Sequence, residues 1–310
     1  MKTLGIHHIT AIVGKAQENV DFYAGILGLR LIKKTVNFDD PGTYHLYFGD
    51  KGGKPGTVIT FFPWNNARKG QIGGGQVGVT TYAVPTGALP FWEKRLAKFD
   101  IPFSKENRFG ETYLQFTDYH GLILEIVERE AGENTEWSHG EVTPDVGIKG
   151  FGGAILFSTN PSETIQAVQE VMGLEKVGEE ADLIRFRSTA DIGNIIDIKQ
   201  SSVPRGKMGI GTVHHIAWRA ENRDNLVEWQ EHVKNNNHYV TEVKDRNYFN
   251  AIYYREQGEI LFEIATDTPG FAVDEAVEEL GIAIKLPENY EARREELVAR
   301  LEPVTVRNLD

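Results

Sequence analysis

Cysteine is absent from the 310 residues of this chain. That absence excludes disulfide bonds, thiolate metal sites and cysteine nucleophiles. No apolar run approaches the roughly 20 residues that a membrane-spanning helix needs, so we expect no membrane partner. The first residues also lack the apolar core of a signal peptide, and we therefore expect a cytoplasmic location.

Positive charge is scarce relative to negative charge. The chain has 33 Lys and Arg against 45 Asp and Glu, which gives a formal net charge of -12. Phosphate-rich partners would be repelled, so the composition argues against a general nucleic-acid or anionic-membrane binder. The 40% hydrophobic and 25% charged content is ordinary for a folded protein, and the length suits about two domains.

The sequence does contain a unit that is repeated four times. Each unit opens with an alternating strand, continues into an amphipathic helix and returns through two or three more strands. The predicted opening strands and helices are, in order, 5–13 with 16–27, 78–84 with 89–99, 152–158 with 161–172, and 213–219 with 223–235. The matching segments 26–29 (Ile-Leu-Gly-Leu) and 171–174 (Val-Met-Gly-Leu) favour a true repeat over coincidental spacing.

The best candidate for a linker is the stretch 129–146, which is rich in Gly, Glu, Asn, Ser and Thr. We therefore expect an N-terminal domain of two units over residues 1–130 and a C-terminal domain of two units over residues 147–270. The charged segment 274–302 predicts a helical tail within 271–310. Among single strands, the pattern predicts one continuous strand over 108–116 and another over 240–244.

Two His-His pairs, His7-His8 and His214-His215, open the first and fourth units in similar apolar settings. Near the end of the fourth unit, Glu263 lies inside an apolar strand-like run. Side chains alternate between the faces of a strand, and in each strand the second His, or the Glu, lies opposite the more apolar face. If the apolar faces pack beneath helices, His8, His215 and Glu263 point into one concavity.

These three residues allow more than one interpretation. A lone strand histidine is often a hydrogen-bonded core residue, and a glutamate between apolar neighbours can be a paired core charge. A buried unpaired carboxylate is costly, however, so Glu263 needs a cation. Two imidazoles and one carboxylate suit Fe(II), with Mn(II) as a near neighbour, whereas zinc would use the same set to activate water. Composition alone does not choose among these metals.

The second and third units carry competing carboxylates but no competing histidines. Glu125 and Asp197 close these units at positions like that of the acid in the fourth unit, whereas the opening strands have no histidine near 79–80 or 154–155. We therefore expect one metal site, shared by the first and fourth units. The remaining histidines are expected to be structural or exposed: His45, His120, His139, His232 and His238.

The paired histidine strands, the Phe262-Glu263 step and the fourfold βαβββ pattern resemble the vicinal oxygen chelate superfamily. More narrowly, the chain resembles the hydroquinone-type ring-cleaving dioxygenases of the glyoxalase/bleomycin-resistance/extradiol dioxygenase fold. The segments that carry this narrower resemblance span nearly the whole chain: 43–48, 55–58, 108–110, 245–249 and 281–287. The resemblance implies an α+β fold of four βαβββ modules, paired into two glyoxalase-like domains with cupped mixed sheets.

Position by position, the resemblance implies Fe(II) ligands at His8, His215 and Glu263, with Mn(II) or another divalent ion as the alternative. It also implies a set of catalytic residues that touch the ligands or the substrate: His7, His214, Arg246 and Tyr253. Simple alternation turns His7 and His214 away from the metal, and a strand twist or a β-bulge would reconcile the two expectations.

The activity that the resemblance implies is oxygen-dependent cleavage of a hydroquinone-like or catechol-like ring, as in aromatic compound degradation and detoxification. The partners would then be a small aromatic substrate and O2, with no nucleic acid and no membrane, and a homo-oligomer is left open. Two alternatives come from other classes. One is a non-oxygenase, metal-dependent lyase or transferase of the glyoxalase type, and the other is a binding protein for aromatic electrophiles.

Overall fold

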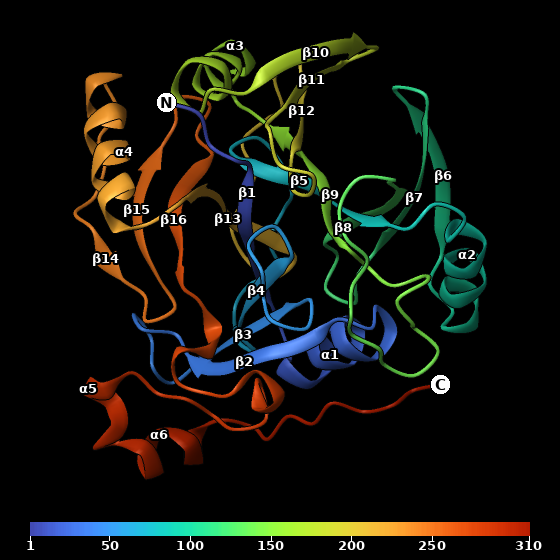
Figure 1. Ribbon diagram of the computed structural model, residues 1–310, viewed down its shortest axis with the longest axis vertical. Coiled ribbons are helices and arrows are strands. Elements are labelled where there is room, and N and C mark those ends of the chain that lie inside the picture. The colour runs from blue at the N-terminus through green and yellow to red at the C-terminus, as the bar shows by residue number, and fades with distance from the viewer.

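The computed structural model describes residues 1–310 and contains the four repeated units as βαβββ modules (Figure 1). Module one consists of β1 (Ile6–Val13), α1 (Ala16–Val20) with a π-helical continuation (Asp21–Ile26), β2 (Arg30–Val36), β3 (Tyr44–Gly49) and β4 (Val58–Pro63). Module two consists of β5 (Gln76–Val84), α2 (Leu89–Lys98), β6 (Phe103–Arg108), β7 (Glu111–Thr117) and β8 (Ile123–Glu128).

The other two modules follow the same order. Module three consists of β9 (Gly150–Phe157), α3 (Pro161–Gln166) with a π-helical continuation (Ala167–Val171), β10 (Glu175–Glu180), β11 (Leu183–Arg187) and β12 (Ile195–Lys199). Module four consists of β13 (Thr212–Ala220), α4 (Arg223–Asn235), β14 (Lys244–Asp245), β15 (Phe249–Arg255) and β16 (Leu261–Pro269).

The sixteen strands form two eight-stranded mixed sheets. The first sheet has the order β14-β15-β16-β13-β1-β4-β3-β2, and the second has the order β10-β11-β12-β9-β5-β8-β7-β6. The opening strands of two modules pair antiparallel at the centre of each sheet, β1 with β13 and β5 with β9. The predicted α+β fold of four modules in two cupped sheets is confirmed.

The sheets combine module one with module four, and module two with module three. The segments 1–130 and 147–270 therefore each supply strands to both sheets. Two single-strand predictions were wrong. The segment 108–116 is broken by a two-residue turn at Phe109 and Gly110, which have φ values of 52° and 75°, as a tight hairpin requires. The segment 240–244 contributes only an isolated bridge at Val240 and the start of the short β14.

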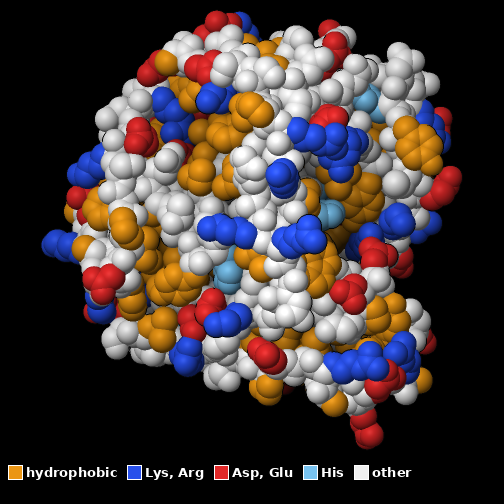
Figure 2. Space-filling model, turned by 180° about the vertical axis from the view of Figure 1, so that it is seen from behind, with side chains coloured by type: hydrophobic (Ala, Val, Ile, Leu, Met, Phe, Trp, Pro, Cys, Tyr) orange, Lys and Arg blue, Asp and Glu red, His pale blue; other side chains and the backbone are white.

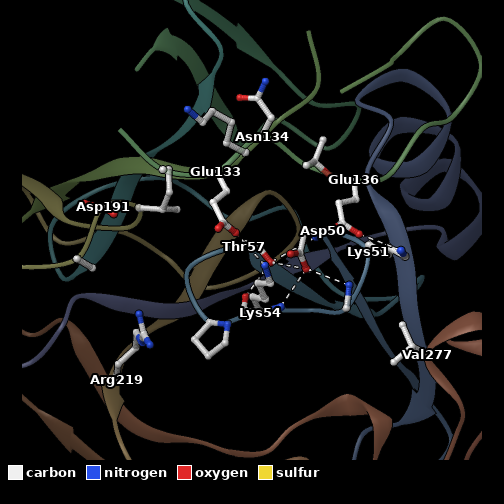
Figure 3. A pocket seen from close by; sticks show the side chains of 17 residues that line it. Asp50, Lys51, Lys54, Thr57, Glu133, Asn134, Glu136, Asp191, Arg219 and Val277 are labelled. Atoms are coloured by element: carbon white, nitrogen blue, oxygen red, sulfur yellow. Dashed lines mark hydrogen bonds and ion pairs between the residues drawn. The ribbon is translucent and has the colours of Figure 1, made fainter. Parts of the chain in front are cut away.

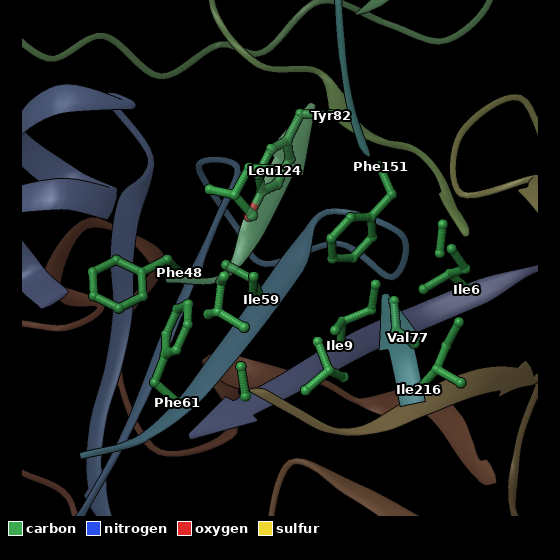
Figure 4. Packing of buried hydrophobic residues seen from close by; sticks show 14 of the residues in the cluster. Ile6, Ile9, Phe48, Ile59, Phe61, Val77, Tyr82, Leu124, Phe151 and Ile216 are labelled. Carbon is green, nitrogen blue, oxygen red and sulfur yellow. The ribbon is translucent and has the colours of Figure 1, made fainter. Parts of the chain in front are cut away.

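One apolar core joins the two sheets and the helices. It is a cluster of 60 buried residues. Ile9 of β1 and Ile216 of β13 belong to this cluster together with Val77 of β5, Tyr82 of β5 and Phe151 of β9 (Figure 4). One face of the first sheet packs against this core. The side chains of β1, β13 and β16 that alternate with the core residues therefore point to the opposite, concave face.

The glycine shared by the first and third modules ends the helix of each. Gly28 and Gly173 have φ values of 70° and 74°, in the left-handed region that favours glycine after a helix. A Cβ on Gly28 would lie 2.6 Å from Val142, so the site has no room for a side chain. The sequence match between 26–29 and 171–174 therefore corresponds to a repeated structural requirement.

After β16 the chain forms two 3-10 helices (Phe271–Val273 and Val277–Glu279), α5 (Glu288–Glu291) and α6 (Arg294–Arg300). Residues 301–310 have no regular structure and run beneath module one (Figure 1). At the end of this segment, the Asp310 carboxylate lies 2.8 Å from the buried guanidinium of Arg95 in α2. Arg307 Nε also donates to Asp21 of module one at 2.8 Å, so the tail contacts both modules one and two.

The surface carries mixed charge. Figure 2 shows one face, on which basic and acidic side chains are interspersed and only small areas of histidine are visible. None of the helices combines the length and the apolar character that crossing a bilayer would demand.

Candidate metal centre

Three buried ligand atoms converge inside the cup of the first sheet. His215 Nε2 lies 2.8 Å and His8 Nε2 lies 3.4 Å from Glu263 Oε2, and the two Nε2 atoms are 3.3 Å apart. The exposed fractions of His8, His215 and Glu263 are 2%, 6% and 0%. The structure therefore brings together the three residues that strand alternation selected.

Two β-bulges interrupt the pairing of β1 with β13. The register passes from Ile6–Trp218 to His8–Ala217, and later from Thr10–His215 to Ala11–Val213. One extra residue, His7, is therefore inserted in β1, and one, His214, in β13. A bulge reorients the inserted side chain, so both imidazoles lie beside the ligand imidazoles rather than on the opposite face of the sheet.

The bulge histidine of β1 fixes the tautomer of the ligand that follows it. His7 Nε2 lies 3.1 Å from the Thr266 carbonyl oxygen, which can only accept a hydrogen. Burial, followed by the neighbouring His8, lowers the pKa of His7 to about 3, so the ring is neutral. His7 Nδ1 therefore accepts from His8 Nδ1, 2.8 Å away, and this arrangement directs His8 Nε2, the atom that would bind a metal, toward Glu263.

The bulge histidine of β13 has the same partner geometry but a different outer neighbour. His214 Nδ1 lies 2.8 Å from His215 Nδ1. Burial, followed by the charge of His215, lowers the pKa of His214 to about 3. Its Nε2 atom has no hydrogen-bond partner among the protein atoms, and its side chain lines the cavity described below.

The carboxylate of Glu263 has no hydrogen bond to either oxygen, although it is fully buried. Its nearest partner is His215 Nε2, which approaches Oε2 at 2.8 Å as an ion-pair contact. Burial opposes ionisation, but His8 and His215 together hold the pKa of this carboxyl well below its usual range. A buried carboxylate and two imidazoles whose Nε2 atoms converge on it fit a divalent cation, which would take the place of the protons on these nitrogens and satisfy all three groups.

Strand register identifies the counterpart of the glutamate ligand in module one. Glu263 pairs with Ala217, two residues after the ligand histidine, and Thr60 pairs with Thr10 in the same relation. The Thr60 hydroxyl is bound to Thr10 Oγ1 at 3.0 Å and to His45 Nε2 at 2.7 Å. The candidate centre therefore offers three possible protein ligands, and its module-one side contributes no carboxylate.

In the second sheet the corresponding carboxylates are neutralised by arginine. Glu125 and Asp197 occupy the register positions of Glu263 in modules two and three. Arg108 donates to both Glu125 oxygens at 3.0 and 2.6 Å and to Asp197 at 3.2 Å. Arg185 binds Asp197 through two further hydrogen bonds of 2.7 and 2.8 Å. Because both acids are paired, this cup does not compete for the metal.

A cavity of about 360 Å³ opens over the three ligands. Arg246 and Tyr253, the last two of the predicted catalytic residues, both line it. Arg246 Nε donates to Tyr253 Oη at 3.2 Å. Burial, followed by Glu263, raises the pKa of Tyr253 well above its usual value, so the phenol is neutral. The other lining residues were not predicted as part of the site: Asn37, Phe38, Asp39, Asp40, His45, Tyr47, Phe62, Trp64 and Phe249.

His45, expected from the sequence to be structural or exposed, is also part of the cavity wall. Its ring is held between Tyr47 Oη at 2.8 Å and Thr60 Oγ1 at 2.7 Å. In the sequence, His45 and Tyr47 share one face of the predicted strand 44–48, but nothing there places that strand beside the metal ligands. Four histidines lie outside this cavity, as expected: His120, His139, His232 and His238.

A larger cavity of about 540 Å³ lies elsewhere and has a different character (Figure 3). Its lining contains no histidine, and two of its lysines are paired with two of its glutamates. Lys51 lies 2.9 Å from Glu136, and Lys54 lies 3.3 Å from Glu133. This cavity offers no set of metal ligands, so the chemistry is assigned to the smaller one.

In comparisons with known proteins, the matching family model and two similar proteins all include dioxygenases in their descriptions. The family described as Glyoxalase/Bleomycin resistance protein/Dioxygenase superfamily matches residues 5–126. The chain is 63% identical over 309 residues to MhqO of Bacillus subtilis (strain 168), a proposed ring-cleaving dioxygenase, covering 100% of this chain and 99% of MhqO. It is 32% identical over 313 residues to a chlorohydroquinone/hydroquinone 1,2-dioxygenase of Sphingobium indicum, covering 97% of each.

A solved structure supports the same relationship. The crystal structure of a proposed dioxygenase from Bacillus subtilis matches with a TM-score of 0.99 at 63% identity, and the match covers 99% of each chain.

Proposed function

The chain belongs to the Glyoxalase/Bleomycin resistance protein/Dioxygenase superfamily, and on that premise we propose that it is an Fe(II)-dependent ring-cleaving dioxygenase of hydroquinone-like or catechol-like substrates. The observation that carries the proposal is the convergence of His8, His215 and Glu263 beneath an aromatic-lined cavity. The relatives named as ring-cleaving dioxygenases support the reaction class.

The three ligands would hold the metal through His8 Nε2, His215 Nε2 and the Glu263 carboxylate. When bound, Fe(II) in a set of two histidines and one carboxylate supplies open coordination positions and a redox-active centre for oxygen chemistry. Thr60 supports this assignment, because a carboxylate at that position would be a fourth protein ligand and would leave fewer positions for substrate and O2. Mn(II) is the nearest alternative by ligand preference.

The cavity suits a single aromatic ring. Its volume of about 360 Å³ is at the small end of the range for small-molecule sites. Its walls include the rings of Phe62, Trp64 and Phe249, and the His45 ring packs against Phe62 with centroids 4.6 Å apart. Aromatic walls bury an apolar ring and fix its plane, which leaves the polar groups to orient the hydroxyls.

Three polar side chains would act on the substrate oxygens. If His215 keeps its hydrogen on Nδ1 in order to ligate through Nε2, then His214 accepts at Nδ1 and carries its hydrogen on Nε2, at the cavity. Arg246 donates to the Tyr253 oxygen, which directs the phenolic hydrogen elsewhere. His214 and Tyr253 are thereby donors that would stabilise negative charge on a hydroxyl oxygen, and Arg246, which is engaged by Tyr253 and Asp39, would act through the phenol.

The direct test is purification without oxygen, metal analysis, and reconstitution with Fe(II). Oxygen uptake is then measured with hydroquinone and with catechol, and the product from ¹⁸O₂ is examined by mass spectrometry. We expect uptake with at least one of these phenols and a ring-opened product carrying both labelled oxygens, with Glu263→Gln as the inactive control. Absence of uptake with every such phenol contradicts the proposal, and activity with Zn(II) or Ni(II) that needs no O2 favours the glyoxalase type.

A further inference from the structure

The cavity over the metal ligands is lined by one Lys or Arg side chain, and that cation is already paired. Arg246 Nη2 lies 3.5 Å from Asp39 Oδ2, and its Nε donates to Tyr253 at 3.2 Å. The guanidinium lies 5.4 Å from the centroid of the Tyr253 ring. The side chain of Arg246 is 18% exposed, whereas that of Asp39 is 76% exposed. Asp39 therefore lies on the solvent side of the pair.

A second carboxylate lines the same side of the cavity. Asp40 follows Asp39 in the loop between β2 and β3 and also contributes to the cavity lining. Its Oδ2 accepts from Trp64 Nε1 and from Thr43 Oγ1, both at 2.9 Å, so its position is fixed. An incoming substrate thus passes two carboxylates before it reaches the metal-binding residues. The one cationic side chain of the lining, Arg246, is already paired with one of these carboxylates.

We propose that Asp39 is a specificity-determining residue that makes the cavity select uncharged dihydroxybenzenes over those that carry a ring carboxylate. This inference rests on the proposed function and names the substrate class of the same site. A substrate carboxylate would lie near Asp39 and Asp40, and the guanidinium of Arg246 that could pair with it is already engaged. The net charge of -12 adds to the repulsion during the approach of an anion.

The charge effect can be isolated with a pair of compounds that differ little in shape. The probes are 2,5-dihydroxybenzamide and 2,5-dihydroxybenzoate, because the amide and the carboxylate are of similar size. Binding of each to the Fe(II)-loaded protein is measured by titration calorimetry without oxygen, and kcat/KM is measured by oxygen uptake. For each protein, the amide-to-acid ratio is kcat/KM (or the association constant) for the amide divided by that for the acid. The decisive quantity is this ratio in a variant divided by the ratio in the native protein, because any chelation of iron by the substituent then cancels.

Asp39→Asn is expected to lower the amide-to-acid ratio about 10-fold, the effect of one charge at short range near a protein surface. Asp39→Glu should restore the native ratio. The matched control is Asp191→Asn, which changes the net charge equally at an exposed residue outside this cavity. An unchanged ratio in Asp39→Asn, or an equal change in Asp191→Asn, overturns the inference while the proposed function stands. If neither probe binds or reacts, both the inference and the proposed function are overturned.

Discussion

The Nδ1 atom of His214 lies 2.8 Å from the Nδ1 atom of His215. The same distance separates His7 from His8, so the two ligand imidazoles are held in the same way by the residues that the β-bulges insert. The outer nitrogens differ, because His7 Nε2 faces the Thr266 carbonyl and His214 Nε2 faces the cavity. We therefore expect His7 to orient a ligand, and His214 to orient a ligand and also to contact the substrate.

Replacing either bulge histidine should separate these roles. In His7→Phe and His214→Phe the neighbouring ligand loses its Nδ1 partner, and the affinity for Fe(II) should fall about 10- to 100-fold. When both variants are saturated with Fe(II), kcat should recover in His7→Phe but stay low in His214→Phe. Chelator competition gives the affinities and oxygen uptake gives kcat. Equal recovery of kcat in the two variants would show that His214 does not act on the substrate.

Replacing the ligand glutamate should remove most of the affinity for the metal. In Glu263→Gln a neutral amide takes the place of the buried carboxylate, so the affinity for Fe(II) should fall by more than about 100-fold. Because His8 and His215 hold the pKa of the Glu263 carboxyl low, its charge also stabilises the metal-free fold, and the metal-free variant should be less stable than the metal-free native protein. Chelator competition and urea unfolding measure the two effects. An equal affinity for Fe(II) in the variant and in the native protein would show that Glu263 is not a ligand.

The half-buried histidine of the cavity wall, His45, should make stability depend on pH. Burial lowers the pKa of His45 well below its usual value of about 6.5, so the folded protein binds this proton less readily than the unfolded chain does. Since the unfolded state binds more protons, the free energy of unfolding should fall as the pH drops below about 6.5, by up to about 1.4 kcal/mol per pH unit from this group. Urea unfolding of His45→Gln, compared with the native protein at several pH values, should show a slope smaller by that amount. Parallel curves would assign the slope to other groups.

The arginine of the second sheet should matter for stability and not for the metal. Arg108→Met leaves Glu125 and Asp197 with fewer partners in a buried setting, which typically costs about 3–5 kcal/mol. The stoichiometry of Fe(II) should stay the same, because the ligands lie in the other sheet. Urea unfolding and metal analysis of one preparation test both parts. A gain of a second bound metal would instead show that arginine had been blocking a site.

The strands and helices of each module were predictable because they depend on residues that are close in the sequence. Alternation and helical periodicity placed the four modules, and His8, His215 and Glu263 followed from the same alternation together with the cost of a buried acid. The positions of His7 and His214 did not follow, since a one-residue bulge reverses the face of a side chain and leaves no regular pattern in the sequence.

Module pairing and the cavity wall depended on long-range contacts. Nothing in the alternation of β1 specifies whether its neighbour is β5 or β13, because both opening strands have an apolar face to bury. The linker stretch suggested pairing along the chain, whereas the structure pairs the outer modules with each other. His45 was missed for a related reason, since its strand becomes part of the site only when β3 curls round the cup toward β15.

Along the chain, the two modules of the second sheet lie between the two modules of the first sheet. This order determines which sheet can be completed first during synthesis. All the strands of the second sheet have been made once the chain reaches Lys199, whereas β1 must wait for β13 and for the strand that carries Glu263. A nascent chain therefore exposes one edge of its first strand, with His7 and His8 on it, for most of its translation. Only the nearly complete polypeptide can hold the metal, so a truncated product would present an unpaired strand edge and no centre.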